Sequence, residues 1–311
     1  MKGMLRHITS YHVPHSVLLS LASLFTLLLG ATAIAGSTSI PFTYQKRVPF
    51  VQVQPTGANQ APMCFILDTA SSPTVIESMA AGHSSGFGNG TTGGLDNAPA
   101  GSVQGFRATC GGLPLRRTAV RTDLTNISRV CGRQVDGLLG ADFLRNKILT
   151  INMASHTLHI EPVPGTDNAP ARMMDDISFN RQDAVFVKIT TPFSKRPLVF
   201  LVDTGTMRCC IDSKAAKRMN LPLGAKHTLN MVGEQKMGCT VDNFAGSYDG
   251  HPLPPQILAV DLSQLSWSFG HHIDGVMGMD FMENYTVKIN FRSHQMQLLP
   301  NRAADFRVAA R

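Results

Sequence analysis

Apolar residues occur along the chain in short blocks separated by turn formers. Residues 48–54 (VPFVQVQ) and 63–67 (MCFIL) are such blocks, with the turn-rich sequence PTGANQAP between them. Residues 184–189 (AVFVKI) and 198–202 (LVFLV) follow the same plan around the turn TPFSKRP. Short runs of apolar and β-branched residues bounded by turn formers are typical of β-strands. The pattern therefore predicts two equivalent β-hairpins.

The two hairpins belong to an internal repeat that divides the chain into two halves. Three further blocks recur in the same order, at residues 68–72 (DTASS) and 203–207 (DTGTM), 135–144 (VDGLLGADFL) and 273–282 (IDGVMGMDFM), and 149–156 (LTINMASH) and 287–294 (VKINFRSH). Because four blocks keep both order and register, we interpret the chain as a duplication.

The duplication sets the expected organisation. We expect an N-terminal lobe, a linker rich in Pro and Gly, a C-terminal lobe and a tail, at residues 36–161, 162–176, 177–300 and 301–311 respectively. Residues 82–105 are rich in Gly, Ser, Thr and Asn and predict a long loop or hairpin tip, with 224–250 in the corresponding place.

Helical patterns are short. We expect helices only at residues 142–146, 213–219 and 280–284. A fold of alternating strands and helices needs repeated amphipathic helices of about 10–15 residues, and the pattern does not contain them. The sequence therefore favours a mainly β protein built as a duplicated β-barrel-like fold.

Composition excludes several classes of protein. Of 311 residues, 43% are hydrophobic and 16% are charged, which excludes a disordered or coiled-coil chain. The formal net charge is +7, but the basic pairs Arg116-Arg117 and Lys217-Arg218 have no interleaved aromatic residues. We therefore expect no nucleic-acid partner.

The first 35 residues have the features of an export segment. Lys2 and Arg6 precede the uncharged run 17–29 (VLLSLASLFTLLL), and Ala31-Thr32-Ala33 fits a cleavage site for small residues. The alternative is an uncleaved membrane anchor, because about 20 apolar residues can span a bilayer. Either alternative predicts an exported protein, periplasmic or secreted, in contact with a membrane only through this segment.

All six cysteines follow this segment, and export would place them in an oxidising compartment. One hypothesis pairs Cys110 with Cys131, and Cys239 with Cys209 or Cys210. No CxxC motif occurs, and His271-His272 have no spaced partners, so we predict no metal site.

Asp68 and Asp203 occupy the same position in the two halves, each just beyond an apolar strand. A two-fold arrangement of the halves would bring their carboxylates together. Two close carboxylates cannot both ionise cheaply and share one proton over a wide pH range. Such a pair can take a proton from water while giving one to a carbonyl oxygen, which is general acid–base catalysis of amide hydrolysis without a cofactor.

With these residues the chain resembles the pepsin-like and retropepsin-like aspartic proteases. The paired signatures are DTASS and DTGT, the first followed later in its half by DGLLGADF and the second by DGVMGMDF. The resemblance spans about residues 45–300 and is closer to a duplicated retropepsin-like unit than to the larger pepsin lobes. It implies an acid protease fold of two β-barrel lobes related by a pseudo-two-fold axis. It also implies an exported, monomeric aspartic endopeptidase that acts on polypeptides.

The resemblance also implies roles for individual residues. Asp68 and Asp203 would be the catalytic pair. The supporting residues would be those that hold the loops together across the axis (Thr69 and Thr204), those that support the outer carboxylate oxygens (Ser71 and Thr206), and Gly205 in the same loop. Gly140 and Gly278 would pack beneath the loops as structural residues.

Two features complete this hypothesis. Asp136, Asp142, Asp274 and Asp280 are interpreted as turn or helix-cap residues. Ala70 stands where the family usually has Gly, and a Cβ there would strain a loop that needs positive φ.

Two alternatives from other classes of function stay open. One is a catalytically weak or inactive relative that binds extended peptides by strand-like pairing, which Ala70 favours. The other is a structural or envelope-associated β-protein in which the duplication serves packing alone. A serine hydrolase lacks its G-x-S-x-G motif here, and Cys209-Cys210 lie in an apolar stretch that favours packing over nucleophilic chemistry.

Overall fold

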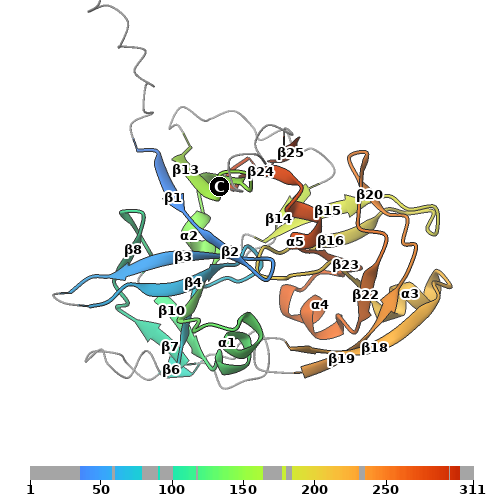
Figure 1. The fold of residues 1–311 in the computed structure, drawn as a ribbon, viewed down its shortest axis with the longest axis horizontal. Coiled ribbons are helices and arrows are strands. Elements are labelled where there is room, and N and C mark those ends of the chain that lie inside the picture. Colours follow the sequence, from blue (N-terminus) through green and yellow to red (C-terminus); the bar gives the residue numbers. More distant parts are fainter. Residues whose placement is uncertain are drawn as a thin grey trace, which may run out of the picture. The chain divides into compact units, whose positions relative to one another are not determined.

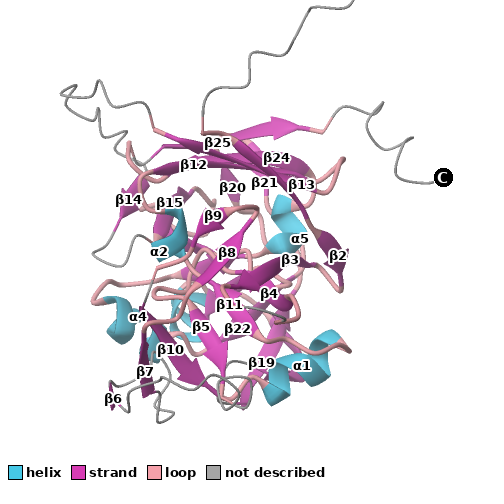
Figure 2. Ribbon diagram, turned by 90° about the vertical axis from the view of Figure 1, so that its left-hand side faces the viewer, coloured by secondary structure: helices cyan, strands magenta, loops and turns pink. Residues whose placement is uncertain are grey.

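The computed structural model describes residues 36–57, 60–78, 90–91, 101–116, 118–163, 177–179, 184–230, 235–293 and 295–301. The predicted export segment, most of the linker and nearly all of the C-terminal tail lie outside these residues, as does the centre of the 82–105 loop. Within the described part, no helix has the length and apolar character needed to cross a membrane. The protein is mainly β, and its curled sheets include a half-barrel. Figure 2 shows the predominance of strands and the shortness of the helices.

The first half of the chain contributes a sheet of ten strands among the described residues. They are β2 (Thr43–Gln45), β3 (Val48–Pro55), β4 (Met63–Leu67), β5 (Val75–Glu77), β6 (Gly90–Thr91), β7 (Gly101–Gln104), β8 (Ala108–Cys110), β9 (Leu113–Pro114), β10 (Thr118–Thr122) and β11 (Gly137–Leu139). Their order is β6-β7-β10-β5-β11-β4-β3-β8-β9, and β2 pairs with β3. Since β6 and β7 are antiparallel, the described residues of the 82–105 segment form a hairpin.

The second half contributes a sheet of eight strands within the described part. They are β14 (Ile177–Phe179), β15 (Val185–Ile189), β16 (Leu198–Val202), β17 (Cys210–Asp212), β18 (Leu223–Asn230), β19 (Gln235–Val241), β22 (Ile257–Val260) and β23 (Gly275–Met277). Their order is β14-β15-β16-β23-β17-β22-β19-β18. A small hairpin of β20 (Ser247–Tyr248) and β21 (His251–Pro252) completes this half. Figure 1 shows β3 beside β4, and β18 beside β19.

Strand pairing repeats between the two halves. β4 is parallel to β11, and β16 is parallel to β23. β5 is antiparallel to β11 and parallel to β10, while β17 is antiparallel to β23 and parallel to β22. The sequence blocks that recur therefore build the same strand contacts twice.

A third sheet contains strands of both halves. It runs in the order β1-β13-β12-β24-β25, from β1 (Thr38–Pro41), β13 (Thr157–Pro162), β12 (Lys147–Asn152), β24 (Tyr285–Asn290) and β25 (Gln295–Pro300). β12 and β24 belong to the last repeated block and pair antiparallel with each other. Thr150 lies opposite Lys288, its own counterpart in the repeat.

Three predicted helices are present, slightly shorter than expected. They are α2 (Ala141–Leu144), α3 (Ser213–Arg218) and α5 (Met279–Met282). Two more, α1 (Thr125–Cys131) and α4 (Ser263–Phe269), were not predicted. The carboxylates of Asp123 and Asp261 accept hydrogen bonds from the first amide of each, and a glycine in the left-handed region ends each. Each helix thus begins at an Asp-Leu-Thr or Asp-Leu-Ser sequence, at residues 123–125 and 261–263. These two sequences keep the register of the other repeats and form a fifth repeated block.

The core lies on both faces of the large sheets. Along β3, Val51 and Val53 pack into the main hydrophobic cluster, while Val48 and Phe50 pack into a separate cluster with α1. Strands buried on both faces are apolar along most of their length rather than alternating, which explains the sequence VPFV. The equivalent strand β15 also packs on both faces. Val187 lies in the main cluster, and Phe186 lies in a third cluster together with Phe269 of α4.

The disulfide hypothesis is wrong for this structure, in which all six cysteines are free. Cys110 packs into the main cluster, whereas Cys131, at the end of α1, packs into the cluster on the opposite face of the sheet. The two thiols therefore face different parts of the core.

We expect mass spectrometry of the denatured, unreduced protein to find six alkylated cysteines per chain after iodoacetamide treatment. Burial raises the pKa of Cys110 and Cys210 to about 12, so the native protein should be alkylated far more slowly than the denatured protein. Fewer than six modified cysteines in the denatured chain would show that disulfides form.

Candidate active site

The two aspartates lie at the ends of equivalent strands. Asp68 follows β4 and Asp203 follows β16. The amide of Asp68 donates to the carbonyl of Leu139 at 3.0 Å, and the amide of Asp203 donates to that of Met277 at 3.0 Å. The parallel neighbours β11 and β23 thus fix the point at which each chain leaves its sheet.

Two buried threonines link the two loops by reciprocal hydrogen bonds. The Thr69 amide donates to Thr204 Oγ1 at 3.1 Å, and the Thr204 amide donates to Thr69 Oγ1 at 3.2 Å. Each hydroxyl then donates to the strand of the opposite half, Thr69 to the Val202 carbonyl at 2.9 Å and Thr204 to the Leu67 carbonyl at 2.7 Å. Both side chains are fully buried. The structure thus brings together the two equivalent segments, which lie far apart in the sequence.

The carboxyl groups of Asp68 and Asp203 approach the same point, because a Cβ placed on Gly205 would lie 2.9 Å from Asp68 Oδ2 and 3.2 Å from Asp203 Oδ1, and each carboxyl shifts the pKa of the other. Asp68 Oδ1 also accepts from the amides of Ala70 at 3.0 Å and Ser71 at 2.9 Å. Asp203 Oδ1 accepts from the Gly205 amide at 2.7 Å, and Asp203 Oδ2 accepts from the Thr206 hydroxyl at 2.5 Å. The pair is therefore oriented by backbone amides on both sides and by one side-chain hydroxyl.

The surroundings make the two aspartates unequal. Burial raises the pKa of Asp68 well above its usual range, and the charge of Asp203 raises it further, against the opposing amides of Ser71 and Ala70. Burial also raises the pKa of Asp203, but the hydrogen bonds from Thr206 and Gly205 lower it. Both residues are partly exposed, although the protein around their carboxyl groups removes most of the hydration of these groups. We conclude that the two carboxyls titrate as one unit, in which burial raises the pKa of both groups and the charge of Asp203 raises that of Asp68 further.

Ser71 and Thr206 do not play equivalent parts, contrary to the expectation from the repeat. The Ser71 hydroxyl donates to the Pro73 carbonyl at 3.1 Å, and only its backbone amide reaches Asp68. A serine hydroxyl readily bonds the backbone close to its own position, whereas β-branched Thr206 has few side-chain rotamers. One carboxyl of the pair thus has hydroxyl support and the other does not.

Thr206→Val should raise the pKa of Asp203, because the Oγ1 hydrogen bond that favours the ionised form is lost. Ser71→Ala should leave the titration of the pair unchanged. The measurement is an NMR titration of the side-chain carboxyl carbons in protein labelled with ¹³C-aspartate. Equal shifts in the two variants would contradict the assigned asymmetry.

Gly205 and Ala70 are counterparts with different surroundings. A Cβ on Gly205 would lie 2.9 Å from Asp68 Cγ and 3.2 Å from Asp203 Oδ1, so this position has no space for a side chain. Ala70 has a negative φ, and its methyl group packs against the cluster that contains Phe186. The strain expected from a Cβ at Ala70 is therefore absent.

Gly140 and Gly278 lie against the two loops. A Cβ on Gly140 would be 2.7 Å from the Ser71 carbonyl oxygen, and one on Gly278 would be 2.9 Å from that of Thr206. Such contacts with backbone atoms have no flexible side chain to move. Both positions therefore require glycine, because the backbone of the neighbouring aspartate loop leaves no room for a Cβ atom.

The four other repeated aspartates do not have the predicted roles. Asp142 and Asp280 do not cap α2 and α5. Asp142 Oδ1 accepts from the Thr74 hydroxyl at 2.8 Å, and Asp280 Oδ1 accepts from the Cys209 amide at 2.8 Å. The helices therefore anchor the segments that follow the aspartate loops. Asp136 and Asp274 likewise accept from strand amides rather than forming turns, as described below.

Two residues of this network were missed by the sequence argument. The Gly140 amide donates to Thr74 Oγ1 at 3.2 Å, and the Gly278 amide donates to Cys209 Sγ at 3.3 Å. Thr74 and Cys209 are counterparts in the repeat, each six positions after its aspartate, and this shared place was the available signal. Cys209 is therefore a buried hydrogen-bond acceptor.

Among the described residues, no group of His, Cys, Asp and Glu side chains is arranged to hold a metal ion. No protein-family model matches the chain, and a search of curated proteins found no match. The interpretation of the site therefore depends on its geometry.

Proposed function

We propose that this protein is an exported aspartic endopeptidase that hydrolyses peptide bonds with a water activated between Asp68 and Asp203. The observation that carries the proposal is the close pair of carboxyl groups, which are contributed by equivalent residues of the two halves and brought together by the reciprocal threonine hydrogen bonds. Structural aspartates are usually paired with cations or helix ends, whereas two carboxyls that share a proton are suited to acid–base chemistry.

The proposed arrangement is two retropepsin-like lobes related by a pseudo-two-fold axis. Two contacts support it. Thr69 and Thr204 exchange the same hydrogen bonds with each other, and Thr150 pairs with its own counterpart Lys288. A pair of equivalent residues that meet each other is what a local two-fold axis produces.

In the proposed mechanism, the two aspartates act in opposite senses. Asp203, stabilised as the carboxylate by Thr206 and Gly205, accepts a proton from the attacking water. Asp68 donates its proton to the carbonyl oxygen, and a tetrahedral diol forms without a covalent enzyme intermediate. Asp203 then gives its proton to the amide nitrogen while Asp68 takes one back from a hydroxyl of the diol. The C–N bond breaks, a carboxyl and an amine are released, and the starting protonation of the pair is restored.

The hairpins that follow each aspartate loop are the proposed substrate-covering elements. β18 and β19 form such a hairpin in the second half, and β6 and β7 form one in the first. An extended polypeptide would lie beneath them, bound partly by strand-like hydrogen bonds. The proposed enzyme works as a monomer, without metal or organic cofactor.

The test is cleavage of a defined peptide mixture by the purified protein between pH 3 and pH 8, followed by mass spectrometry. We expect endoproteolytic products and their suppression by a peptide whose scissile amide is replaced by a secondary alcohol, because that group mimics the tetrahedral intermediate. A folded protein that binds the alcohol peptide without cutting any substrate would favour the peptide-binding alternative. A folded protein that does neither would overturn both.

A further inference from the structure

We propose that Arg196, Arg218 and His272 form a binding site for a phosphate group, arranged around the buried carboxylate of Asp274. The site belongs to the second half of the chain and is independent of the aspartate pair. Its ligand is a phosphate monoester or diester, either in a soluble molecule or in a lipid headgroup.

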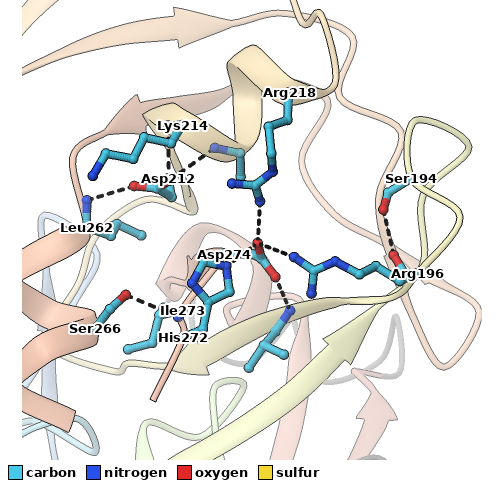
Figure 3. Close-up of polar contacts among 12 residues, drawn as sticks. Ser194, Arg196, Asp212, Lys214, Arg218, Leu262, Ser266, His272, Ile273 and Asp274 are labelled. Atoms are coloured by element: carbon cyan, nitrogen blue, oxygen red, sulfur yellow. Dashed lines mark hydrogen bonds and ion pairs between the residues drawn. The ribbon is translucent and has the colours of Figure 1, made fainter. Parts of the chain in front are cut away.

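Three side chains from different segments converge on one oxygen atom. Asp274 Oδ1 lies 3.0 Å from Arg218 Nη2, 3.4 Å from Arg196 Nη2 and 2.9 Å from His272 Nε2. Arg196 comes from the turn before β16, Arg218 from the end of α3, and His272 from the segment that leads to β23. Figure 3 shows them pointing toward Asp274 from separate directions.

Burial is unequal within the cluster. The side chain of Asp274 has no solvent exposure, while those of Arg196, Arg218 and His272 are 59%, 51% and 53% exposed. The carboxylate thus serves as a buried anchor that orients half-exposed donors. Their outer surfaces remain open to a ligand.

Comparison with the first half shows that an aspartate at this position can hold its neighbouring strand without a cation. Asp274 Oδ2 accepts from the Val199 amide at 3.1 Å, and its counterpart Asp136 accepts from the Cys64 amide at 2.7 Å. The remaining oxygen of Asp136 accepts from Gln134 Nε2 at 2.5 Å. Asp136 makes no ion pair with any described residue. The two arginines are therefore an addition to the second half, beyond what the strand contact requires.

The charge of the cluster is positive. Two guanidinium groups face one carboxylate, and the flanking Lys195 and Lys217 are exposed. The other nearby carboxylate, Asp212, is buried and caps α3 through the amides of Lys214 and Ala215, while its second oxygen accepts from Leu262. Figure 3 shows this neighbouring set beside the cluster. Net positive charge and oriented donors are the requirements for binding an oxyanion.

Arginine chemistry favours phosphate as that oxyanion. A guanidinium has five N–H donors, and each arginine here directs one nitrogen at Asp274. Two further guanidinium edges can engage a phosphate in paired hydrogen bonds. Since Asp274 already restricts both side chains, less conformational entropy is lost when a ligand binds.

The test is isothermal titration of the full chain with inorganic phosphate at constant ionic strength, with chloride as the competing anion. We expect saturable binding that is weakened at least about tenfold in the double variant Arg196→Gln/Arg218→Gln. The matched control is Arg47→Gln, because Arg47 is 49% exposed and, among the described residues, forms one ion pair, with Glu283 at 3.0 Å. Arg47→Gln should bind phosphate as the wild type does.

Two further measurements keep the test decisive. Arg196→Lys retains the positive charge and Asp274 but loses the planar guanidinium, so it should bind phosphate more weakly. This variant keeps the test informative even if the double variant does not fold.

Co-sedimentation with phosphatidylglycerol vesicles, compared with phosphatidylcholine vesicles, identifies whether the phosphate belongs to a lipid headgroup. Residues 1–35 are common to all variants, so differences between variants do not come from that segment. Binding to phosphate or to the anionic vesicles that depends on both arginines supports the site. Binding that is absent, or equal in all variants, overturns it.

Discussion

Asp68→Asn and Asp203→Asn are each expected to lower kcat/KM for peptide cleavage at least about 1,000-fold, or about 4 kcal/mol of transition-state stabilisation. An Asn side chain can neither take the proton from water nor give one to the substrate, so it serves in neither step of the proposed reaction. Because the carboxyls act as one unit, the double variant should be no less active than the weaker single variant. The measurement is steady-state cleavage of one peptide at the pH optimum of the wild type.

Although Asp68→Asn should lower activity, it should raise the stability of the folded protein at neutral pH. The pKa of Asp68 is raised in the folded state above its ordinary value near 3.8. The contribution of Asp68 to stability is therefore complete below that value and is lost as the pH rises through the raised pKa. Asp68→Asn should thus unfold at a higher denaturant concentration than the wild type at pH 7, because a neutral amide avoids the cost of keeping Asp68 protonated, or of ionising it beside Asp203, above its ordinary pKa.

The matched control is Asp123→Asn, which changes an exposed carboxylate at the start of α1. It should retain wild-type activity. Loss of activity in Asp123→Asn equal to that in Asp68→Asn would mean that the loss reflects folding. Full activity in either variant of the pair would contradict the proposed mechanism.

Removing one threonine hydroxyl of the cross-link should give the largest stability effect, about 2–6 kcal/mol in the free energy of unfolding, since it leaves two buried polar groups unsatisfied and each costs about 1–3 kcal/mol. In Thr204→Val, the Thr69 amide and the Leu67 carbonyl both lose their partner in a fully buried position. Chemical denaturation monitored by circular dichroism measures the change.

Two control substitutions define this prediction. Thr204→Ser keeps the hydroxyl and should recover most of the stability. Thr190→Val removes an exposed hydroxyl that contacts Ser247, and it should cost no more than about 1 kcal/mol. If Thr204→Val were no more destabilising than Thr190→Val, the threonine link would not hold the two loops together.

The two halves have kept one backbone plan while their side chains have diverged. Strand pairing, the aspartate loops and the close approach at Gly140 and Gly278 are the same in each. The hydroxyl that supports one carboxyl, and the arginines around Asp274, occur in the second half. The two halves therefore differ in the partners of these side chains rather than in their backbone arrangement.

The sequence by itself determined the duplication, the mainly β class, and the position of each aspartate after a buried strand. These features depend on local patterns: apolar strands such as residues 198–202, turn formers between them, and blocks repeated in register. The helices α1 and α4 were also determined locally, but their short D-L-[ST] start was not recognised.

Only the tertiary structure decided which partners the polar side chains choose. Ser71 and Thr206 are counterparts, yet one hydroxyl turns to Pro73 and the other to Asp203. Asp274 meets Arg196 and Arg218 across 78 and 56 residues of sequence. A hydrogen bond requires about 3 Å and a favourable angle, and local sequence patterns do not fix distances between remote segments to that precision.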